Sequence, residues 1–179
     1  MIDNGWKYSS NKWRKTDNYR HLSIELDLLV IKQDSDLVKV AKKIKEQLEV
    51  VGIEINLKEV KYNEFNKYLE NGKYDLVLVS NNYGYSPSLK KYFGTENLAN
   101  YQNEEIINII SDIDNISDEN ELKQKYTRIT EIYNDEVPYI SLYYDMNTII
   151  YSPNLKGTIN PNSYNLFYEL QTWYREYEK

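Results

Sequence analysis

The sequence predicts an α/β fold with a β-α-β-α-β core, a mixed sheet and flanking helices. Three observations predict it. Residues 22–31 alternate between apolar and polar side chains, residues 37–51 carry apolar side chains at helical spacing, and residues 76–79 are apolar without interruption. These patterns are typical of a half-exposed strand, an amphipathic helix and a buried strand. The connections are long enough to hold helices, so we expect parallel strands with right-handed crossovers.

The first strand is predicted over residues 22–31, because one face holds its apolar side chains Leu22, Ile24, Leu26, Leu28 and Val30. Such a period of two indicates a half-buried strand. Asp34 or Ser35 can cap the helix that follows. The apolar stripe of this helix consists of Leu37, Val40, Ala41, Ile44, Leu48 and Val51. Gly52 ends the helix, since glycine readily adopts a positive φ.

The second strand is predicted from the alternation of Ile53, Ile55 and Leu57, and a short helix follows over residues 62–71. Residues 76–79 then favour a central strand that is covered on both faces. They lead into a polar loop over residues 80–87.

The second half of the chain predicts two helices and then extended segments. Isoleucines predict a well-buried helix over residues 103–114, and a second helix runs from a cap at Ser117 to Pro138. Three extended segments are predicted after it: strands at 139–144 and 148–151, joined by a turn at 145–147, and a final strand or extended tail at 164–174. With no internal repeat or flexible linker, we expect one lobe over residues 1–179.

Composition excludes several classes of function. The 179 residues are 41% hydrophobic and 28% charged, which is typical of a folded domain, and the net charge is −6. That charge argues against nucleic acid and anionic membranes as partners. The absence of cysteine removes disulfides and thiolate chemistry. No apolar run of 18 residues and no signal peptide is present, and the residues after Met1 read like the middle of a longer chain.

The sequence also argues against an enzyme, a cofactor and a metal centre. His21 is the only histidine, and we expect it on the surface. The acidic residues 112–118 lack the central glycine of a calcium-binding loop. We find no glycine-rich phosphate loop and no pair of nucleophile and base. An enzyme with this order of elements would need such a pair.

The candidate ligand site is the loop that leaves the predicted strand 76–79. Ligands of open parallel sheets bind beyond the carboxyl ends of the strands. The loop offers a hydroxyl, two amides and two phenols, from Ser80, Asn81, Asn82, Tyr83 and Tyr85. Amides satisfy a peptide backbone, and tyrosine rings form a flat wall with a polar tip. These residue types are also the usual ones of turns, so the residues alone leave both interpretations open.

Several segments together resemble one family. They are Gly5-Trp6, residues 45–55, Gly72-Lys73-Tyr74-Asp75-Leu76, residues 97–105, residues 136–143 and Leu155-Lys156-Gly157. In this order they resemble the family 5 extracellular solute-binding proteins, the peptide- and nickel-type receptors of ABC importers. The resemblance covers nearly the whole chain and about the last third of a family member.

The resemblance implies a periplasmic-binding-protein-like lobe, the carboxy-terminal half of a two-lobed clamp. The implied partners are a peptide or other small solute, the missing amino-terminal lobe and an ABC permease. The implied location is outside the cell membrane, either in the periplasm or anchored at the cell surface as a lipoprotein. It also makes Ser80, Asn81, Asn82, Tyr83 and Tyr85 ligand-facing residues.

The loop departs from the peptide-binding pattern of the family. Asn81 stands where many members have tryptophan, Gly84 where they have the aspartate that binds the ligand's amino group, and Leu78 where some have arginine. We therefore expect a ligand that is neutral on this side or held by the other lobe. A rival interpretation is the ligand-sensing lobe of a family 5-like transcriptional regulator. The sequence upstream would distinguish the two interpretations, since a lipoprotein signal would support transport and a DNA-binding head would support regulation.

Overall fold

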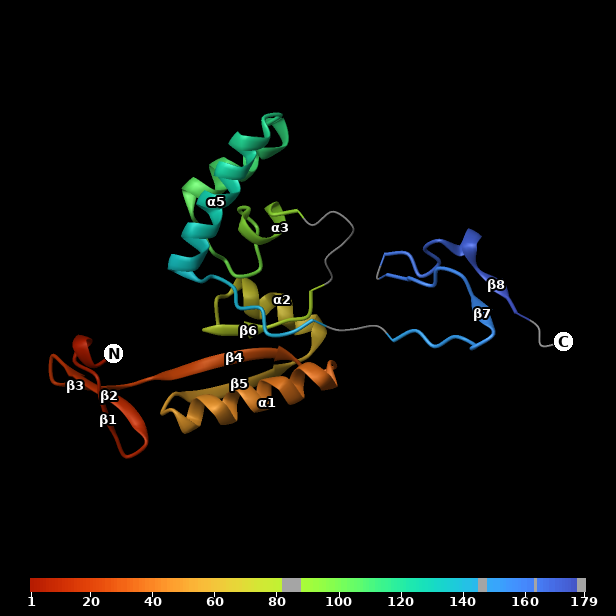
Figure 1. Ribbon diagram of the computed structural model, residues 1–179. Coiled ribbons are helices and arrows are strands. Elements are labelled where there is room, and N and C mark those ends of the chain that lie inside the picture. The colour runs from red at the N-terminus through yellow and green to blue at the C-terminus, as the bar shows by residue number, and fades with distance from the viewer. Residues whose placement is uncertain (82–87, 145–147, 163, 177–179) are drawn as a thin grey trace. The chain divides into compact units, whose positions relative to one another are not determined.

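The structure is a computed structural model that describes residues 1–81, 88–144, 148–162 and 164–176. The chain divides into two compact units, Met1–Asn82 and Tyr83–Lys179, and Figure 1 shows the elements of each. The expectation that both units form one lobe stays a prediction.

The N-terminal unit contains the predicted β-α-β-α-β core. Its three strands are parallel and lie in the order β5-β4-β6. The elements are β4 (Glu25–Ile31), α1 (Ser35–Val50), β5 (Glu54–Val60), α2 (Tyr62–Glu70) and β6 (Leu76–Leu78). In Figure 1, α1 and α2 lie on opposite faces of the sheet.

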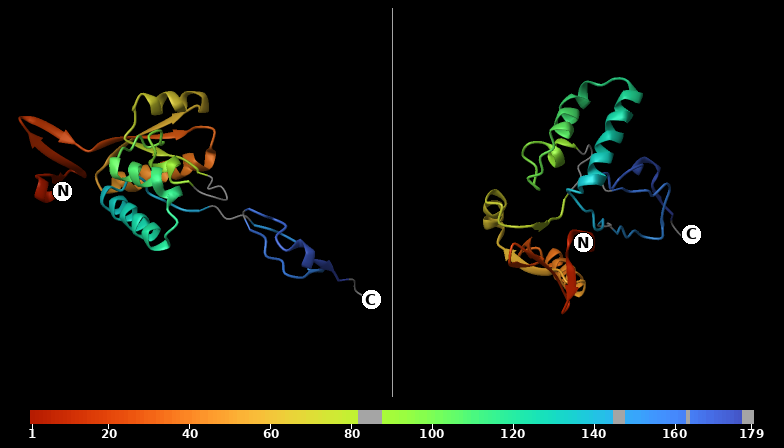
Figure 2. Two further views of the ribbon diagram at one scale, coloured as in Figure 1. Left: turned by 90° about the horizontal axis from the view of Figure 1, so that it is seen from above. Right: turned by 90° about the vertical axis from the view of Figure 1, so that its left-hand side faces the viewer.

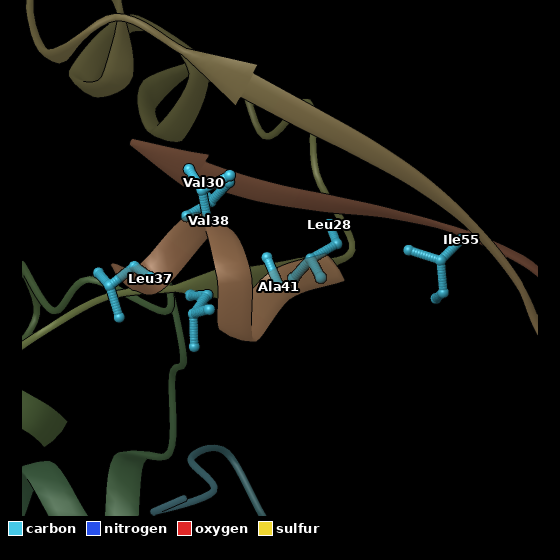
Figure 3. Close-up of a cluster of buried hydrophobic side chains, with 7 residues drawn as sticks. Leu28, Val30, Leu37, Val38, Ala41 and Ile55 are labelled. Atoms are coloured by element: carbon cyan, nitrogen blue, oxygen red, sulfur yellow. The ribbon is translucent and has the colours of Figure 1, made fainter. Parts of the chain in front are cut away.

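The face of the sheet toward α1 holds the larger apolar cluster. Leu28 and Val30 of β4 pack there with Leu37, Val38, Ala41, Ile55 and Leu78, most of which Figure 3 labels. Asp34 is the N-cap of α1, because its Oδ1 accepts a hydrogen bond from the Leu37 amide at 3.0 Å. This is the capping bond that either Asp34 or Ser35 was predicted to make.

The opposite face, toward α2, buries Leu29 together with Val60 and Phe65. Because both Leu28 and Leu29 are buried, the second half of β4 is covered on both faces and is not the half-buried strand that was predicted. β4 is also the central strand of this sheet. The run 76–79 was predicted to be a central strand covered on both faces, but it lies at an edge of the described sheet, where Leu78 is buried and Leu76 is exposed. The pattern of apolar residues along a strand indicates which side chains are buried, and it carries no information about the order of strands in the sheet.

A small antiparallel sheet precedes this core and was not predicted. It follows a 3-10 turn η1 (Ile2–Asn4) and consists of β1 (Lys7–Ser9), β2 (Lys12–Asp17) and β3 (Arg20–Ser23). The predicted strand 22–31 therefore begins too early, since Leu22 pairs with Lys15 in this other sheet. The pairing of β4 with β5 in the core begins only at Glu25.

The antiparallel sheet holds the turn between α1 and β5. Trp13 donates from Nε1 to the Val51 carbonyl oxygen at 2.9 Å, and Tyr8 packs against Trp13. Gly52 ends α1 as predicted, with φ +86°. A Cβ at Gly52 would lie 2.5 Å from the Tyr8 ring. This position therefore needs glycine for its backbone conformation and for the close approach of the ring.

The C-terminal unit has a helical core, and both predicted helices are confirmed. The elements are α3 (Lys90–Phe93), α4 (Glu104–Asp112), η2 (Ile113–Asn115) and α5 (Glu119–Glu136). Figure 2 shows α4 and α5 as a pair of adjacent helices, which bury Phe93, Ile106, Ile109, Ile110, Ile129 and Ile132. The cap of α5 is Asp118 and not Ser117, because the Asp118 carboxylate accepts from the Glu121 amide at 2.8 Å.

The two strands predicted after α5 are wrong within the described residues. Residues 139–144 and 148–151 carry no strand, and the predicted turn at 145–147 lies outside the described residues. Of the final segment 164–174, only Tyr174 belongs to a strand. The elements here are β7 (Leu155–Lys156), η3 (Leu170–Thr172) and β8 (Tyr174–Arg175), and β7 pairs with β8.

Candidate ligand site at the carboxyl edge of the parallel sheet

The carboxyl ends of β4, β5 and β6 lie along one edge of the parallel sheet. Ile31 pairs with Val60, and Val30 pairs with Leu78. The Lys32 amide still donates to the Val60 carbonyl oxygen at 2.8 Å. The residues that follow these strands therefore emerge side by side, at the edge where open parallel sheets bind ligands.

Two of the five predicted ligand residues are described at this edge. Ser80 and Asn81 follow β6, where Ser80 is exposed and Asn81 is half-buried. The other three, Asn82, Tyr83 and Tyr85, lie outside the described residues. The contact of all five with a ligand stays a prediction.

Gln33 and Tyr62 belong to the same edge and were missed from the sequence. Gln33 follows β4, and its Oε1 accepts a hydrogen bond from the Tyr62 amide at 3.1 Å. Tyr62 begins α2 directly after β5, and its side chain is 72% exposed. Both could have been found by taking the first polar residues after every parallel strand, and not only those after the most apolar one.

The described part of the edge carries charges of both signs, because the first turns of α1 and α2 also hold the acids Asp36 and Glu64. Lys32 and Lys61 flank Gln33 and Tyr62, and within the described residues neither lysine has an ion-pair partner. The nearest acid in sequence, Asp34, is engaged in capping α1. The edge therefore presents a phenol, two amides and a hydroxyl, a set that can donate to and accept from a polar ligand.

A second polar centre lies in the C-terminal unit and is closed by its own hydrogen bonds. Asn97 is buried, and its Nδ2 donates to the carbonyl oxygens of Gly94 and Tyr101 at 2.8 and 2.5 Å. Its Oδ1 accepts from the Tyr101 amide at 3.0 Å. The Tyr139 hydroxyl lies 3.1 Å from the same oxygen. With its amide fully used, Asn97 holds the loop before α4 in place.

Glu136 connects the end of α5 to the loop before α4 by hydrogen bonds. It accepts hydrogen bonds from the Tyr101 hydroxyl at 2.5 Å and from Asn103 Nδ2 at 3.0 Å. Burial, together with the bond to Glu136, raises the pKa of Tyr101 to about 12. Two of the segments that carry the family resemblance, residues 97–105 and 136–143, are thus joined to each other. We assign Asn97, Tyr101 and Glu136 a structural role, because these polar groups are satisfied internally.

Two shallow hollows lie elsewhere, over α4 and α5. The first, of about 370 Å³, is lined by residues of α5 alone. The second, of about 320 Å³, includes Glu105, Asp112 and Lys125. Arg128 borders both hollows, and it forms ion pairs with Glu105 at 2.6 Å and with Glu131 at 3.0 Å. Neither hollow contains a residue of the predicted ligand site.

The described ranges contain no candidate metal site and no candidate membrane span. No group of three or more His, Cys, Asp or Glu side chains there could hold a metal ion. Across the same residues, each helix is too short or too polar to cross a bilayer.

Comparisons by sequence found no matching family model and no matching curated protein. Solved structures do match. The oligopeptide-binding protein AppA from Bacillus subtilis, solved with a nonapeptide, matches 98% of this chain and 36% of its own, at 20% identity and TM-score 0.66. NikZ from Campylobacter jejuni, solved with Ni(L-His), matches 96% of this chain and 37% of its own, at 16% identity and TM-score 0.64.

A third match is the periplasmic oligopeptide-binding protein of an ABC transporter from Thermotoga maritima, solved with mannohexaose. It matches 80% of this chain and 29% of its own, at 21% identity and TM-score 0.65. These neighbours are binding proteins rather than enzymes, and this chain spans about a third of their length. The predicted resemblance is thus confirmed at the level of the fold: this chain has the fold of a part of the family 5 solute-binding proteins.

Proposed function

We propose that this chain is one lobe of an extracellular solute-binding protein that captures a solute, expected to be a peptide, for an ABC importer. The ligand would bind at the carboxyl edge of the parallel sheet, between this lobe and a second one. Closure of two lobes buries a ligand, so that each lobe contributes part of the affinity. The solute would pass unchanged to a permease, and the protein would lie in the periplasm or anchored at the cell surface.

The observation that supports the lobe assignment is the number of large apolar side chains that are exposed among residues 140–144, 148–162 and 164–174. Ile140, Leu142 and Tyr144 alternate like one face of a strand, yet all three are exposed. Ile150 is 91% exposed, and Phe167 is exposed as well. A soluble protein rarely leaves so many large apolar side chains in contact with water. A second lobe that packs against them would explain why they are apolar.

A peptide is supported by the kind of groups at the carboxyl edge. Gln33, Asn81 and Ser80 can pair with the N–H and C=O groups of a peptide backbone without any fixed charge. Tyr62 adds an exposed ring for side-chain contact. AppA was solved with a nonapeptide, which fits a site of this kind. The absence of an acid at Gly84 argues against a salt bridge with the peptide's free amino group from this loop.

The test compares this chain alone with a protein that contains both lobes. Calorimetry with a peptide library should detect binding to the two-lobed protein and none to this chain alone. In the two-lobed protein, Gln33→Ala and Asn81→Ala should each weaken peptide binding by roughly three- to tenfold, the value of one hydrogen bond. Asn120→Ala, an exposed position on α5, is the matched control and should change nothing.

Two results would contradict the proposal. One is peptide binding to the isolated chain as tight as binding to the two-lobed protein. The other is a two-lobed protein whose affinity for a bound solute is unchanged by both Gln33→Ala and Asn81→Ala.

A further inference from the structure

The small antiparallel sheet is positively charged although the chain as a whole is acidic. Residues 7–23 contain one acid, Asp17, and five bases: Lys7, Lys12, Arg14, Lys15 and Arg20. The whole chain has a net charge of −6. The expectation that the protein avoids anionic surfaces was based on that net value. The net charge of the whole chain therefore gives no information about the local charge of this sheet.

Two cations of this sheet are placed at the expense of its own stability. Lys7 lies directly opposite Arg14 in the β1–β2 register, and like charges in directly opposed positions destabilise a strand pair. Within the described residues, Lys12 pairs with Glu54, whereas Lys7, Arg14, Lys15 and Arg20 form no ion pair there. Four positive charges thus lack an ion pair in that part of the chain, although Arg20 lies directly opposite Asp17 in the β2–β3 register.

The turn between β2 and β3 holds a tyrosine where glycine is favoured. Asn18 and Tyr19 have φ values of 46° and 66°, a two-residue turn that is best formed by Asn-Gly. The Tyr19 side chain is fully exposed, so it contributes no packing that would offset this backbone strain. An aromatic ring at the tip, next to Arg20, therefore points to a contact outside the fold.

The arrangement of the charges indicates what that contact is. Lys7 and Arg14 share one face of the sheet, while Lys15 and Arg20 share the other, because side chains alternate along a strand. A flat protein partner would meet one face only. Only the end of the sheet around Tyr19 is exposed on both faces, because Trp13 and Tyr8 of the Lys15 face contact the turn between α1 and β5. A layer of lipid headgroups surrounds an inserted tip of this kind, and tyrosine rings are favoured at that depth.

We propose that the sheet β1–β3 binds anionic phospholipid headgroups, with Tyr19 at the level of the headgroups and the four cations against their phosphates. Such binding is independent of solute capture and would hold this part of the protein close to the membrane surface. It would be weak and would fall with added salt, since exposed charges are screened.

The experiment is sedimentation of the chain with phosphatidylcholine vesicles, with and without phosphatidylglycerol. We expect binding to the vesicles that contain phosphatidylglycerol, and loss of that binding at high salt. Each neutralised cation should weaken it by roughly fivefold, so the triple variant Lys7→Gln, Arg14→Gln, Arg20→Gln should lower it by about a hundredfold. Tyr19→Gly should weaken binding while raising the melting temperature, because glycine removes the strain of the turn.

The matched control is Lys39→Gln, Lys42→Gln, Lys43→Gln, which removes three charges from exposed side chains of α1. Circular dichroism of each variant shows whether the fold is kept. The proposal is overturned if the chain does not sediment with phosphatidylglycerol vesicles. Equal binding to neutral vesicles, or an equal loss in the α1 control, would overturn it as well.

Discussion

The two units of this chain differ in how completely they cover their own apolar residues. In the N-terminal unit, both faces of the sheet core are buried, by α1 on one side and α2 on the other. In the C-terminal unit, α3, α4 and α5 bury a core of their own, but residues 140–174 leave most of their large apolar side chains exposed. The sheet core of the first unit is therefore covered by its own helices, and we propose that another lobe covers the exposed apolar side chains of the second.

The largest expected effect separates these two kinds of apolar residue. Leu29→Ala, in the fully buried centre of β4, should destabilise the chain by about 2–5 kcal/mol. Leu142→Ala, at an exposed position, should change the stability of the isolated chain by less than about 0.5 kcal/mol. Urea unfolding of both variants measures the difference. A loss for Leu142→Ala comparable to that of Leu29→Ala would mean that residues 140–174 already pack within this chain.

A smaller effect is expected at the turn between α1 and β5. Gly52→Ala places a Cβ within 2.5 Å of the Tyr8 ring at a residue with positive φ, and such strain costs about 1–3 kcal/mol. Gly72→Ala is the matched control, because Gly72 also has a positive φ but no atom lies within 4 Å of its added Cβ. Thermal unfolding of both variants separates the contact from the backbone conformation. Equal losses would mean that Tyr8 contributes nothing.

Removal of the buried amide of Asn97 should lower the free energy of unfolding by about 1–3 kcal/mol. Asn97→Ala leaves the Tyr101 amide and two carbonyl oxygens without their partner. Asn66→Ala, at an exposed position of α2, is the control and should stay within about 0.5 kcal/mol of the parent chain. If urea unfolding gives the same stability for both variants, Asn97 does not hold the loop before α4.

The last effect is confined to alkaline pH and is the dependence of stability on pH that Tyr101 contributes. Its pKa is raised in the folded chain from 10.0 to about 12, so folding favours the protonated phenol. The stabilisation is complete below pH 10 and is lost as the pH rises toward 12. Tyr101→Phe should remove this component of the pH dependence, as measured by urea unfolding across that range. An unchanged alkaline profile in Tyr101→Phe would contradict the assignment.

The features that the sequence could predict are those that depend on residues close together in the chain. The β-α-β-α-β core and the long helices were predictable, because local periodicity and caps such as Asp34 act within a few residues. Strand order was not, since β4 is central through its pairing with two strands that come later in the chain. The antiparallel sheet was missed because most of its side chains are polar or exposed and give no apolar alternation.

The strands predicted at 139–144 and 148–151 fail for a different reason. Residues 140–144 do alternate and residues 148–151 are mostly apolar, but a strand also needs a neighbour to pair with, and the local sequence does not supply one. At the candidate site, Ser80 and Asn81 were found from a single loop. To predict Gln33 as a site residue, one must know that β4 and β5 end at the same edge, and this depends on strand pairing and not on the local sequence.

The central claim is that a second lobe covers residues 140–174, and amide hydrogen exchange at residues 140–144 tests it most directly. The rate is measured in this chain alone and in a protein that contains both lobes. We predict fast exchange in the isolated chain and strong protection in the two-lobed protein, because extended backbone without partners exchanges freely. Protection in the isolated chain, or fast exchange in both proteins, would contradict the account.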